Sequence, residues 1–210
     1  MCKEYLTIAK EAVAELEEKK SRFIANVKPV ASEDEAHEFI SGLKTRYWNA
    51  THNVYAYYIC SDQEQQKFSD DGEPSGTAGM PVLEAIKRLD VQDVAVVVTR
   101  YFGGTLLGAA GLVRAYGKSA ALGIEAAGIV RKRLCAEVRI MMDYSLLGKV
   151  QALAASRGYG VKDTVYAQDV DMIVYIPVDE LDEFSTLIID ATNAKALIDI
   201  GDKSYQAFAM

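Results

Sequence analysis

The sequence predicts an α+β protein of two domains, 1–134 and 135–210. In the first part, strand and helix patterns alternate around an almost continuous apolar, β-branched run at 94–98. Such a run is typical of a central strand covered on both faces. From residue 137 the pattern restarts as β-α-β-β-α-β, the order of a ferredoxin-like unit. A length of 210 residues suits one large domain or two small ones, and the restart favours two.

The first helix has the clearest signals. Ser32 is followed three positions later by Glu35, which is the pattern of a capping box. We therefore predict a helix at 33–46. The apolar positions that recur at helical spacing, and that we expect to be buried, are Ala36, Phe39, Ile40 and Leu43.

The other elements of the first domain follow from similar signals. Pro81 suits the first turn of a helix, because an N–H group there has no partner within the helix. Gly128 suits the C-cap of the long helix rich in alanine and glycine that precedes it. The expected strands are 5–8, 21–27, 52–60 and 94–98, and the further helices are 81–89 and 108–127.

A short basic link is expected at 129–134, before the second domain begins. The second domain should then contain two helices and four strands, with an irregularity at Gly201 in the last strand. The expected strands are 138–142, 161–166, 170–176 and 196–208, and the expected helices are 146–157 and 179–193.

Composition points to a cytoplasmic protein with no membrane partner. No apolar run approaches the roughly 20 residues that cross a bilayer, and residues 1–5 lack the basic-then-apolar layout of a signal peptide. The three cysteines, Cys2, Cys60 and Cys135, are widely spaced and odd in number. This pattern predicts neither a disulfide framework nor a metal site, so a reducing compartment is the simplest expectation.

The net charge of −7 is unevenly distributed. Residues 1–136 carry a net charge of −1, whereas residues 137–210 carry −6. An acidic surface repels phosphate backbones at long range, so nonspecific nucleic-acid binding is not expected of the second domain. The basic run Arg131-Lys132-Arg133 leaves two interpretations open, an RNA-binding patch or a solvated linker, and the acidic second domain favours the linker.

The segment 69–116 contains two glycine-rich turns that a buried core does not require. The first is acidic and carries Asp70, Asp71 and Glu73 within a run that reads SDDGEPSGT. Clustered carboxylates are ligands for hard divalent cations. However, the spacing matches no EF-hand, and Asp-Asp-Gly-Glu-Pro is also good turn chemistry. A metal site and a structural or protein-contact loop both remain open, and the loop is favoured.

Ser75, Gly76 and Thr77 precede the start of a helix, where free backbone N–H groups favour an anion. The nearby carboxylates would oppose a phosphate unless Arg100 or Arg114 neutralised them. The alternative is that Asp70 or Asp71 forms an ion pair with one of these arginines and locks two loops together. The residues do not decide between an anion site and a structural pair.

The second turn, Arg100-Tyr101-Phe102-Gly103-Gly104, follows the central strand. Its glycines do not have the spacing of a dinucleotide-binding fingerprint. Further along, Gly117-Lys118-Ser119 resembles the end of a phosphate-binding loop, but the first glycine of that motif would fall on Leu112. The run also lies inside a helix pattern. A nucleotide-binding loop is therefore rejected.

Enzyme chemistry has weak support. His37 lies in an amphipathic helix pattern, whereas His52 opens a strand and could face the loops. A catalytic base at His52 is possible in principle, but no nucleophile stands out beside it, and a hydrogen-bonding role is favoured. None of the cysteines has a context that would activate it.

These motifs together closely resemble the IMPACT family, whose bacterial members are the YigZ-type proteins. The resemblance spans almost all of the first domain, with the motifs in order. The acidic second domain resembles, less specifically, the small domain that bacterial members carry. The matching stretches are 20–24 (KSRFI), 50–53 (ATHN), 69–79, 97–104 and 111–116.

The resemblance implies a first domain similar to the second domain of a small-subunit ribosomal protein of the S-five type. It also implies a second domain similar to the fifth domain of elongation factor G. Eukaryotic members regulate translation by competing for an activator of the kinase that senses uncharged tRNA, so the resemblance implies a translation-linked binding protein. The chain departs from the family pattern at Leu106, where lysine is common, and at Ala110, where glycine is common.

We therefore expect a cytoplasmic, non-catalytic binding protein that needs no cofactor and no metal. Its partner is expected to be the translation machinery or a translation factor, with RNA a further possibility. The alternative is a metal- or anion-dependent hydrolase that uses the acidic loop and His52. The expected binding residues are His52, Asp70, Asp71, Glu73, Ser75, Gly76, Thr77, Arg100, Tyr101, Gly103, Gly104 and Arg114.

Overall fold

The computed structural model describes residues 3–60 and 64–208. The chain forms two compact units, so the predicted α+β architecture of two domains is confirmed. One unit is Tyr5–Arg131, and the other is Lys132–Phe208 together with Lys3 and Glu4. The two units divide three residues before the expected division at 134.

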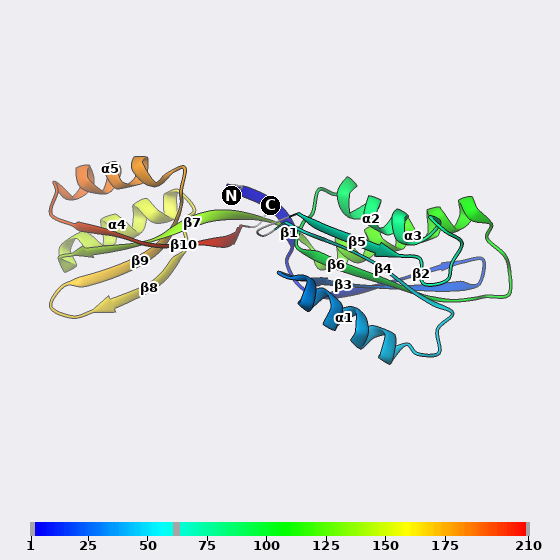
Figure 1. The fold of residues 1–210 in the computed structure, drawn as a ribbon. Coiled ribbons are helices and arrows are strands. Elements are labelled where there is room, and N and C mark those ends of the chain that lie inside the picture. The colour runs from blue at the N-terminus through cyan, green and yellow to red at the C-terminus, as the bar shows by residue number, and fades with distance from the viewer. Residues whose placement is uncertain (1–2, 61–63, 209–210) are drawn as a thin grey trace. The chain divides into compact units, whose positions relative to one another are not determined.

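The first unit is built on an antiparallel sheet whose strand order is β2-β3-β6-β4-β5 (Figure 1). The strand β1, Glu4–Ile8, lies outside this sheet. The sheet strands are β2 (Ala12–Glu18), β3 (Ser21–Pro29), β4 (His52–Ile59), β5 (Gln65–Ser69) and β6 (Val94–Tyr101). The helices are α1 (Glu33–Arg46), α2 (Gly79–Arg88) and α3 (Ala109–Ala127).

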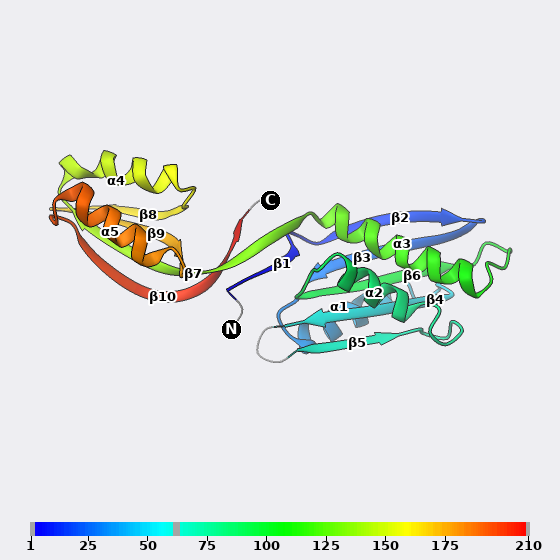
Figure 2. The ribbon, with the colours of Figure 1, turned by 90° about the horizontal axis from the view of Figure 1, so that it is seen from above.

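Helices cover both faces of this sheet. The helix α1 packs on one face, and α2 and α3 pack on the other (Figure 1). From above, α3 lies along β2 and beside α2 (Figure 2). Residues 94–98 of β6 are fully buried and alternate between the two cores, which confirms the prediction of a central strand covered on both faces.

The helix α1 has the predicted bounds and the predicted buried stripe. Ser32 is its N-cap, and its Oγ accepts a hydrogen bond from the Glu35 backbone N–H at 3.2 Å. The Glu35 carboxylate accepts from the Ala31 backbone N–H at 2.8 Å, one residue before the usual partner in a capping box. The serine and the glutamate thus satisfy two free N–H groups at this helix start.

The second unit has the predicted β-α-β-β-α-β order. Its strands lie in the order β10-β7-β9-β8, which is the order of a ferredoxin-like sheet, and β1 also pairs with β7. Its apolar core includes Phe184, Ile188 and Met172. The elements are β7 (Ile129–Met142), α4 (Tyr144–Ser156), β8 (Val161–Tyr166), β9 (Val170–Pro177), α5 (Leu181–Thr192) and β10 (Leu197–Phe208).

The predicted basic link at 129–134 is wrong, because these residues form the first part of β7. Apolar residues flank the three basic ones, with Ile129 and Val130 before them and Leu134 after them, and β1 offers a pairing edge. The edge strands β2 and β5 were not predicted. In β2 the half-buried Ala12, Ala14 and Leu16 alternate with exposed residues, as in a strand with one buried face. This alternation is hard to recognise in the sequence, because most of the exposed residues are glutamates.

Candidate functional site

The acidic loop connects β5 to α2 and is organised around Asp70. One oxygen, Oδ1, accepts hydrogen bonds from the backbone N–H groups of Ala78 at 3.0 Å and Gly79 at 2.8 Å. The other, Oδ2, accepts from Gly76 at 2.9 Å. Burial alone would raise the pKa of Asp70, but these three N–H groups lower it overall. Asp70 thus closes the loop onto the start of α2, where an anion was one of the expected occupants.

Glycine is required where this loop meets α2. A Cβ atom on Gly79 would lie 2.7 Å from the backbone carbon of Ser69, which is closer than real Cβ contacts. The end of β5 and the start of α2 therefore touch through backbone atoms.

Asp71 ties the loop to α1 and β4. Its Oδ1 accepts from Lys44 Nζ at 2.7 Å, and its Oδ2 accepts from the Asn53 backbone N–H at 2.6 Å. The Asp71 carbonyl oxygen lies 2.8 Å from His52 Nδ1. Asp71 holds a positive φ of 47°, an uncommon conformation that aspartate tolerates better than most residues. Its carboxylate is therefore fully engaged within the unit.

The carboxylate of Glu73 is the centre of the cluster. Its Oε1 accepts from Arg100 Nη1 at 2.6 Å and from the Tyr116 hydroxyl at 2.7 Å. His52 Nε2 lies 3.7 Å from the same oxygen. Burial raises the pKa of Tyr116, and the hydrogen bond to Glu73 and its charge raise it further. Tyr116 therefore stays protonated and donates to the carboxylate.

Arg100 lies inside the unit and is 5 % exposed. Its position follows from the sheet register, because Arg100 is paired with His52 on β4 and with Phe23 on β3. The guanidinium donates to Ser21 Oγ at 3.3 Å and lies between the rings of Phe23 and Phe102, at 5.5 and 5.6 Å from their centroids. The Arg100 charge is thus neutralised by Glu73, not by Asp70 or Asp71.

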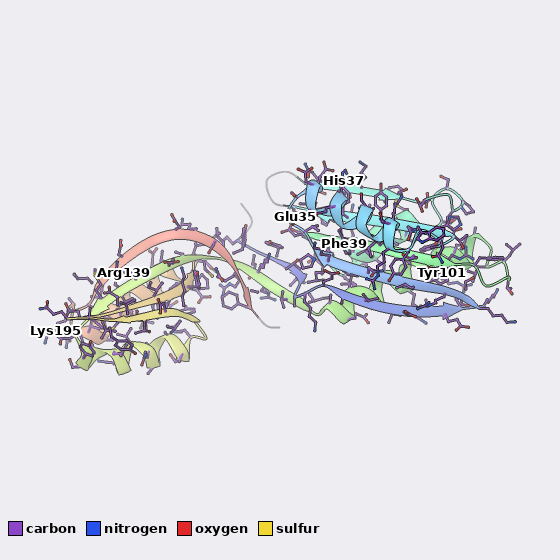
Figure 3. The ribbon with its side chains drawn as sticks, turned by 90° about the horizontal axis from the view of Figure 1, so that it is seen from below. Glu35, His37, Phe39, Tyr101, Arg139 and Lys195 are labelled. Carbon is purple, nitrogen blue, oxygen red and sulfur yellow. The ribbon has the colours of Figure 1, made fainter. Side chains whose placement is uncertain are left out.

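The second glycine-rich turn packs against the β2–β3 hairpin. A Cβ atom on Gly103 would lie 2.0 Å from the backbone carbon and oxygen of Lys20, so only glycine fits there. Its N–H donates to Ser21 Oγ at 3.2 Å. Gly104 has a positive φ of 82°, which continues the turn. At the end of β6, the Tyr101 hydroxyl donates to Asn49 Oδ1 at 3.0 Å (Figure 3).

Some expected site residues lie outside the buried cluster. Arg114 is exposed on α3, and its Nε donates to the Ala110 carbonyl of the same helix at 3.3 Å. Ser75 and Gly76 are exposed at the tip of the acidic loop. Thr77 is buried, and its hydroxyl donates to the Pro74 carbonyl at 2.6 Å. The structure therefore brings His52, Asp71, Glu73 and Arg100 together and leaves Arg114 apart.

Sequence reasoning missed three members of the cluster: Ser21, Asn53 and Tyr116. The buried Asn53 side chain accepts from Thr99 Oγ1 at 2.8 Å and supports the strand that carries Arg100. All three lie inside stretches that resemble the family. Such a stretch does not show which of its polar residues point inward, because that depends on pairing between distant strands.

The contacts of the Glu73 cluster join segments of the first unit to one another. Among the described residues, no group of three or more histidine, cysteine or acidic residues is arranged to hold a metal ion.

Burial raises the pKa of Cys135 to about 11, so this thiol is poorly ionised at neutral pH. Cys60 is exposed, and Cys2 lies outside the described residues. Within the described ranges, no helix is both long and apolar enough to span a membrane.

Comparison with known proteins shows the family to which the chain belongs. Residues 19–124 match the family model of the Impact N-terminal domain, and residues 140–195 match a domain of unknown function, DUF1949. The loops and the Glu73 cluster all lie within the first match. The chain thus belongs to the IMPACT family, as the sequence motifs predicted.

Particular relatives extend the match over most of the chain. The chain is 41 % identical to the IMPACT family member YvyE of Bacillus subtilis over 205 residues, which covers 98 % of this chain and 94 % of that protein. It is 33 % identical to the IMPACT family member YigZ of Escherichia coli, over 82 % of this chain and 85 % of that protein. A crystal structure of a hypothetical protein matches all of this chain and 98 % of its own, with 30 % identity and a TM-score of 0.61.

The match to the eukaryotic proteins is confined to one part of the chain. Protein IMPACT of Rattus norvegicus is 38 % identical over 100 residues, which covers 45 % of this chain and 31 % of that protein. What the two proteins share is therefore about one domain in length.

Proposed function

We propose that this protein is a cytoplasmic, non-catalytic binding protein that acts on the ribosome or on a translation factor. The observation that carries the proposal is the burial of Glu73, whose Oε1 accepts hydrogen bonds from both Arg100 and Tyr116. An acid or base that must exchange protons with a substrate needs an accessible atom. Here the charged residues of the family motifs act as a scaffold that fixes the shape of two loops.

The contact surface in this proposal is the loop between β6 and α3, which begins beside the buried cluster. Phe102 is 47 % exposed and Leu106 is 83 % exposed, both on the loop between β6 and α3. Exposed apolar side chains next to rigid backbone are typical of sites that bind another protein. Leu106 stands where the family commonly has lysine, so this chain offers an apolar contact at that point.

The test is co-sedimentation of the whole protein with ribosomes at low salt, together with capture of translation factors by the immobilised protein. We expect Leu106→Ser to weaken capture by about tenfold, which corresponds to about 1.4 kcal/mol. The matched control is Leu197→Ser, since Leu197 is 65 % exposed and lies in the second unit. If the protein remains in the supernatant and captures no translation component, the proposal fails.

A hydrolase remains the competing function, because His52 Nε2 lies 3.7 Å from a carboxylate oxygen. The same oxygen already accepts two shorter hydrogen bonds, which leaves it a poor partner for orienting a catalytic base. A hydrolase screen with magnesium or manganese discriminates between the two functions. Turnover that His52→Ala abolishes, without a change in melting temperature, would favour the enzyme.

A further inference from the structure

The outer edge of α3 separates two hollows on the helical face of the first unit. One hollow, of about 290 Å³, lies between α3 and the β2–β3 hairpin. The other, of about 470 Å³, lies between α2 and α3. Arg114 and Lys118 line both hollows. Since these residues are four positions apart on a helix, they form one ridge with a spacing of about 6 Å along the axis.

Basic side chains gather at these hollows. Lys19 lines the hollow beside the hairpin and Arg88 lines the one beside α2, and both are exposed, as are Arg114 and Lys118. Across the described part of the chain, none of these four cations forms an ion pair with a carboxylate. Each hollow also has one glutamate in its lining, Glu18 in the first and Glu84 in the second. The face therefore keeps a positive excess in a protein whose net charge is −7.

In the basic run that first suggested RNA binding, Arg133 is already paired. Arg133 forms ion pairs with Glu180 at 2.6 Å and with Asp179 at 3.2 Å. Its charge is therefore used within the second unit. The four cations of the basic face lie instead on α2, α3 and the hairpin tip, which are all parts of the first unit.

The form of the surface favours a polymer of negative charges over a compact anion. All four cations are exposed, so a single small anion held by one or two of them would remain largely hydrated. A polyanion instead gathers several weak contacts at once and releases counterions at each. The small Gly117 lines the hollow beside the ridge, which lets a chain approach closely.

We propose that this basic face of α2, α3 and the hairpin tip binds the phosphodiester backbone of single-stranded nucleic acid without sequence preference. A positive groove that follows the backbone is the usual way to bind a single strand. The inference goes beyond the proposed function, because it uses other side chains than the Phe102–Leu106 loop. Its test uses free oligonucleotides, so it can succeed or fail independently of ribosome binding.

The experiment measures binding of a fluorescein-labelled oligouridylate to the whole protein by anisotropy, over a range of salt concentrations. The test variant is Arg114→Ala/Lys118→Ala. The matched control is Arg46→Ala/Lys67→Ala, which removes the same two residue types from the opposite face of the sheet. Arg46 ends α1, and Lys67 pairs with Tyr57, which belongs to the core under α1.

We expect the test variant to lose at least about tenfold in affinity and to flatten the slope of log K against log salt by about 1.4, or about 0.7 for each lost contact. The control should bind like the unmodified protein, and Arg88→Ala alone should give a smaller loss. An oligothymidylate of the same length shows whether the protein requires an RNA backbone or also binds a DNA backbone. Equal affinity for the two oligonucleotides supports recognition of the phosphates alone. If the protein binds the oligouridylate and not the oligothymidylate, it also contacts the 2′-hydroxyl.

Four outcomes would overturn the proposal. These are no oligonucleotide binding at low salt, an equal loss in the test and control variants, binding of inorganic pyrophosphate as tight as that of the oligonucleotide, and equally tight binding of polyglutamate. The third outcome would indicate a compact-anion site, and the fourth an acidic protein partner. Circular dichroism melting of each variant shows whether a loss of binding comes from unfolding.

Discussion

Each unit holds a glutamate between one arginine and one tyrosine, and the two clusters differ mainly in burial. In the first unit, the side chains of Glu73 and Arg100 are 3 % and 7 % exposed, and Tyr116 is fully buried. The members come from the acidic loop, from β6 and from α3. The cluster therefore joins three segments that lie far apart in the sequence, within the interior of the unit.

In the second unit the same chemistry lies closer to water. Glu180 accepts hydrogen bonds from Arg133 and Tyr159, and the side chains of Glu180 and Arg133 are 31 % and 21 % exposed. Arg133 also contacts Asp179, so its charge is shared. The side chain of Arg139, which forms an ion pair with Asp171 in the same unit, is 52 % exposed (Figure 3).

The difference shows that burial, more than the identity of the partners, determines what an ion pair does. Removing one partner from a buried pair leaves a charge that neither water nor protein stabilises, at a cost of about 3–5 kcal/mol. An exposed pair contributes about 0–1 kcal/mol, because water replaces the lost partner. We therefore expect the Glu73 cluster to determine whether the first unit folds, and the Glu180 cluster to adjust the stability of the second.

The largest expected effect comes from Arg100→Ala. The change leaves Glu73 buried with only Tyr116 as a close donor, so the first unit should lose about 3–5 kcal/mol of unfolding free energy. Arg133→Ala in the second unit should lose about 1 kcal/mol or less. Native-state hydrogen exchange of the amides in β6 and β9 reports the two units separately. Equal losses in the two units would contradict the comparison.

A compensating variant shows whether the loss comes from an unpaired charge. Replacing the whole buried cluster, as Arg100→Met/Glu73→Leu/Tyr116→Phe, leaves no orphaned polar group. It should recover most of the stability, since an apolar replacement of a buried pair is often neutral. If the triple variant is as unstable as Arg100→Ala, the loss arises from packing instead of charge.

The second effect concerns the tyrosines. Tyr116→Phe removes a donor to a buried carboxylate and should cost the first unit about 1.5–3 kcal/mol. Tyr159→Phe, the matched change in the second unit, should cost less, because water reaches Glu180 and can replace the hydroxyl. The same exchange experiment measures both changes. A larger loss for Tyr159→Phe would mean that the exposure of the carboxylate does not determine how much unfolding free energy is lost.

The difference between the clusters also explains how far the sequence could be read. Hydrophobic periodicity and caps predicted α1 and the buried β6, because these signals are local. The location of Arg100 could be expected at the end of β6. Its partner could not, since Glu73 reaches it only after β4 has paired with β6 and positioned the acidic loop. Asp70 and Asp71, which were the expected partners, instead bind backbone N–H groups, Lys44 and the start of α2.

The failures elsewhere have similar causes. Residues 129–134 were expected to form a link because three basic residues lie in a row. In β7, neighbouring side chains point to opposite faces, so such a run need not form one solvated patch. The basic face around Arg114 was not expected, because Lys19, Arg88 and Lys118 come together only when the hairpin and the two helices pack. Local patterns therefore predict elements better than they predict which charges meet.

The smallest expected effect is a pH dependence that also separates the two units. The pKa of Asp70 is lowered by three backbone N–H groups against the effect of burial, and the pKa of Glu180 is lowered by Tyr159 and Arg133, again against burial. A carboxylate with a lowered pKa in the folded state stabilises the protein above its unfolded pKa of about 4, and the contribution disappears as the pH falls through the lowered value. Both units should therefore lose stability below about pH 4.

Asp70→Asn tests this pH dependence in the first unit, with Glu180→Gln as the matched change in the second. An asparagine has one oxygen and no charge, so at neutral pH it should cost about 1–2 kcal/mol through weaker bonds to the N–H groups of Gly76, Ala78 and Gly79. Once the pH has fallen through the lowered pKa of Asp70, the variant should approach the unmodified protein, because Asp70 is then protonated as well. Exchange of the β6 amides measured across this pH range should show a flatter slope for Asp70→Asn, with the slope of the β9 amides unchanged. A β6 slope as steep as that of the unmodified protein would mean that acid acts on the first unit through a group other than Asp70.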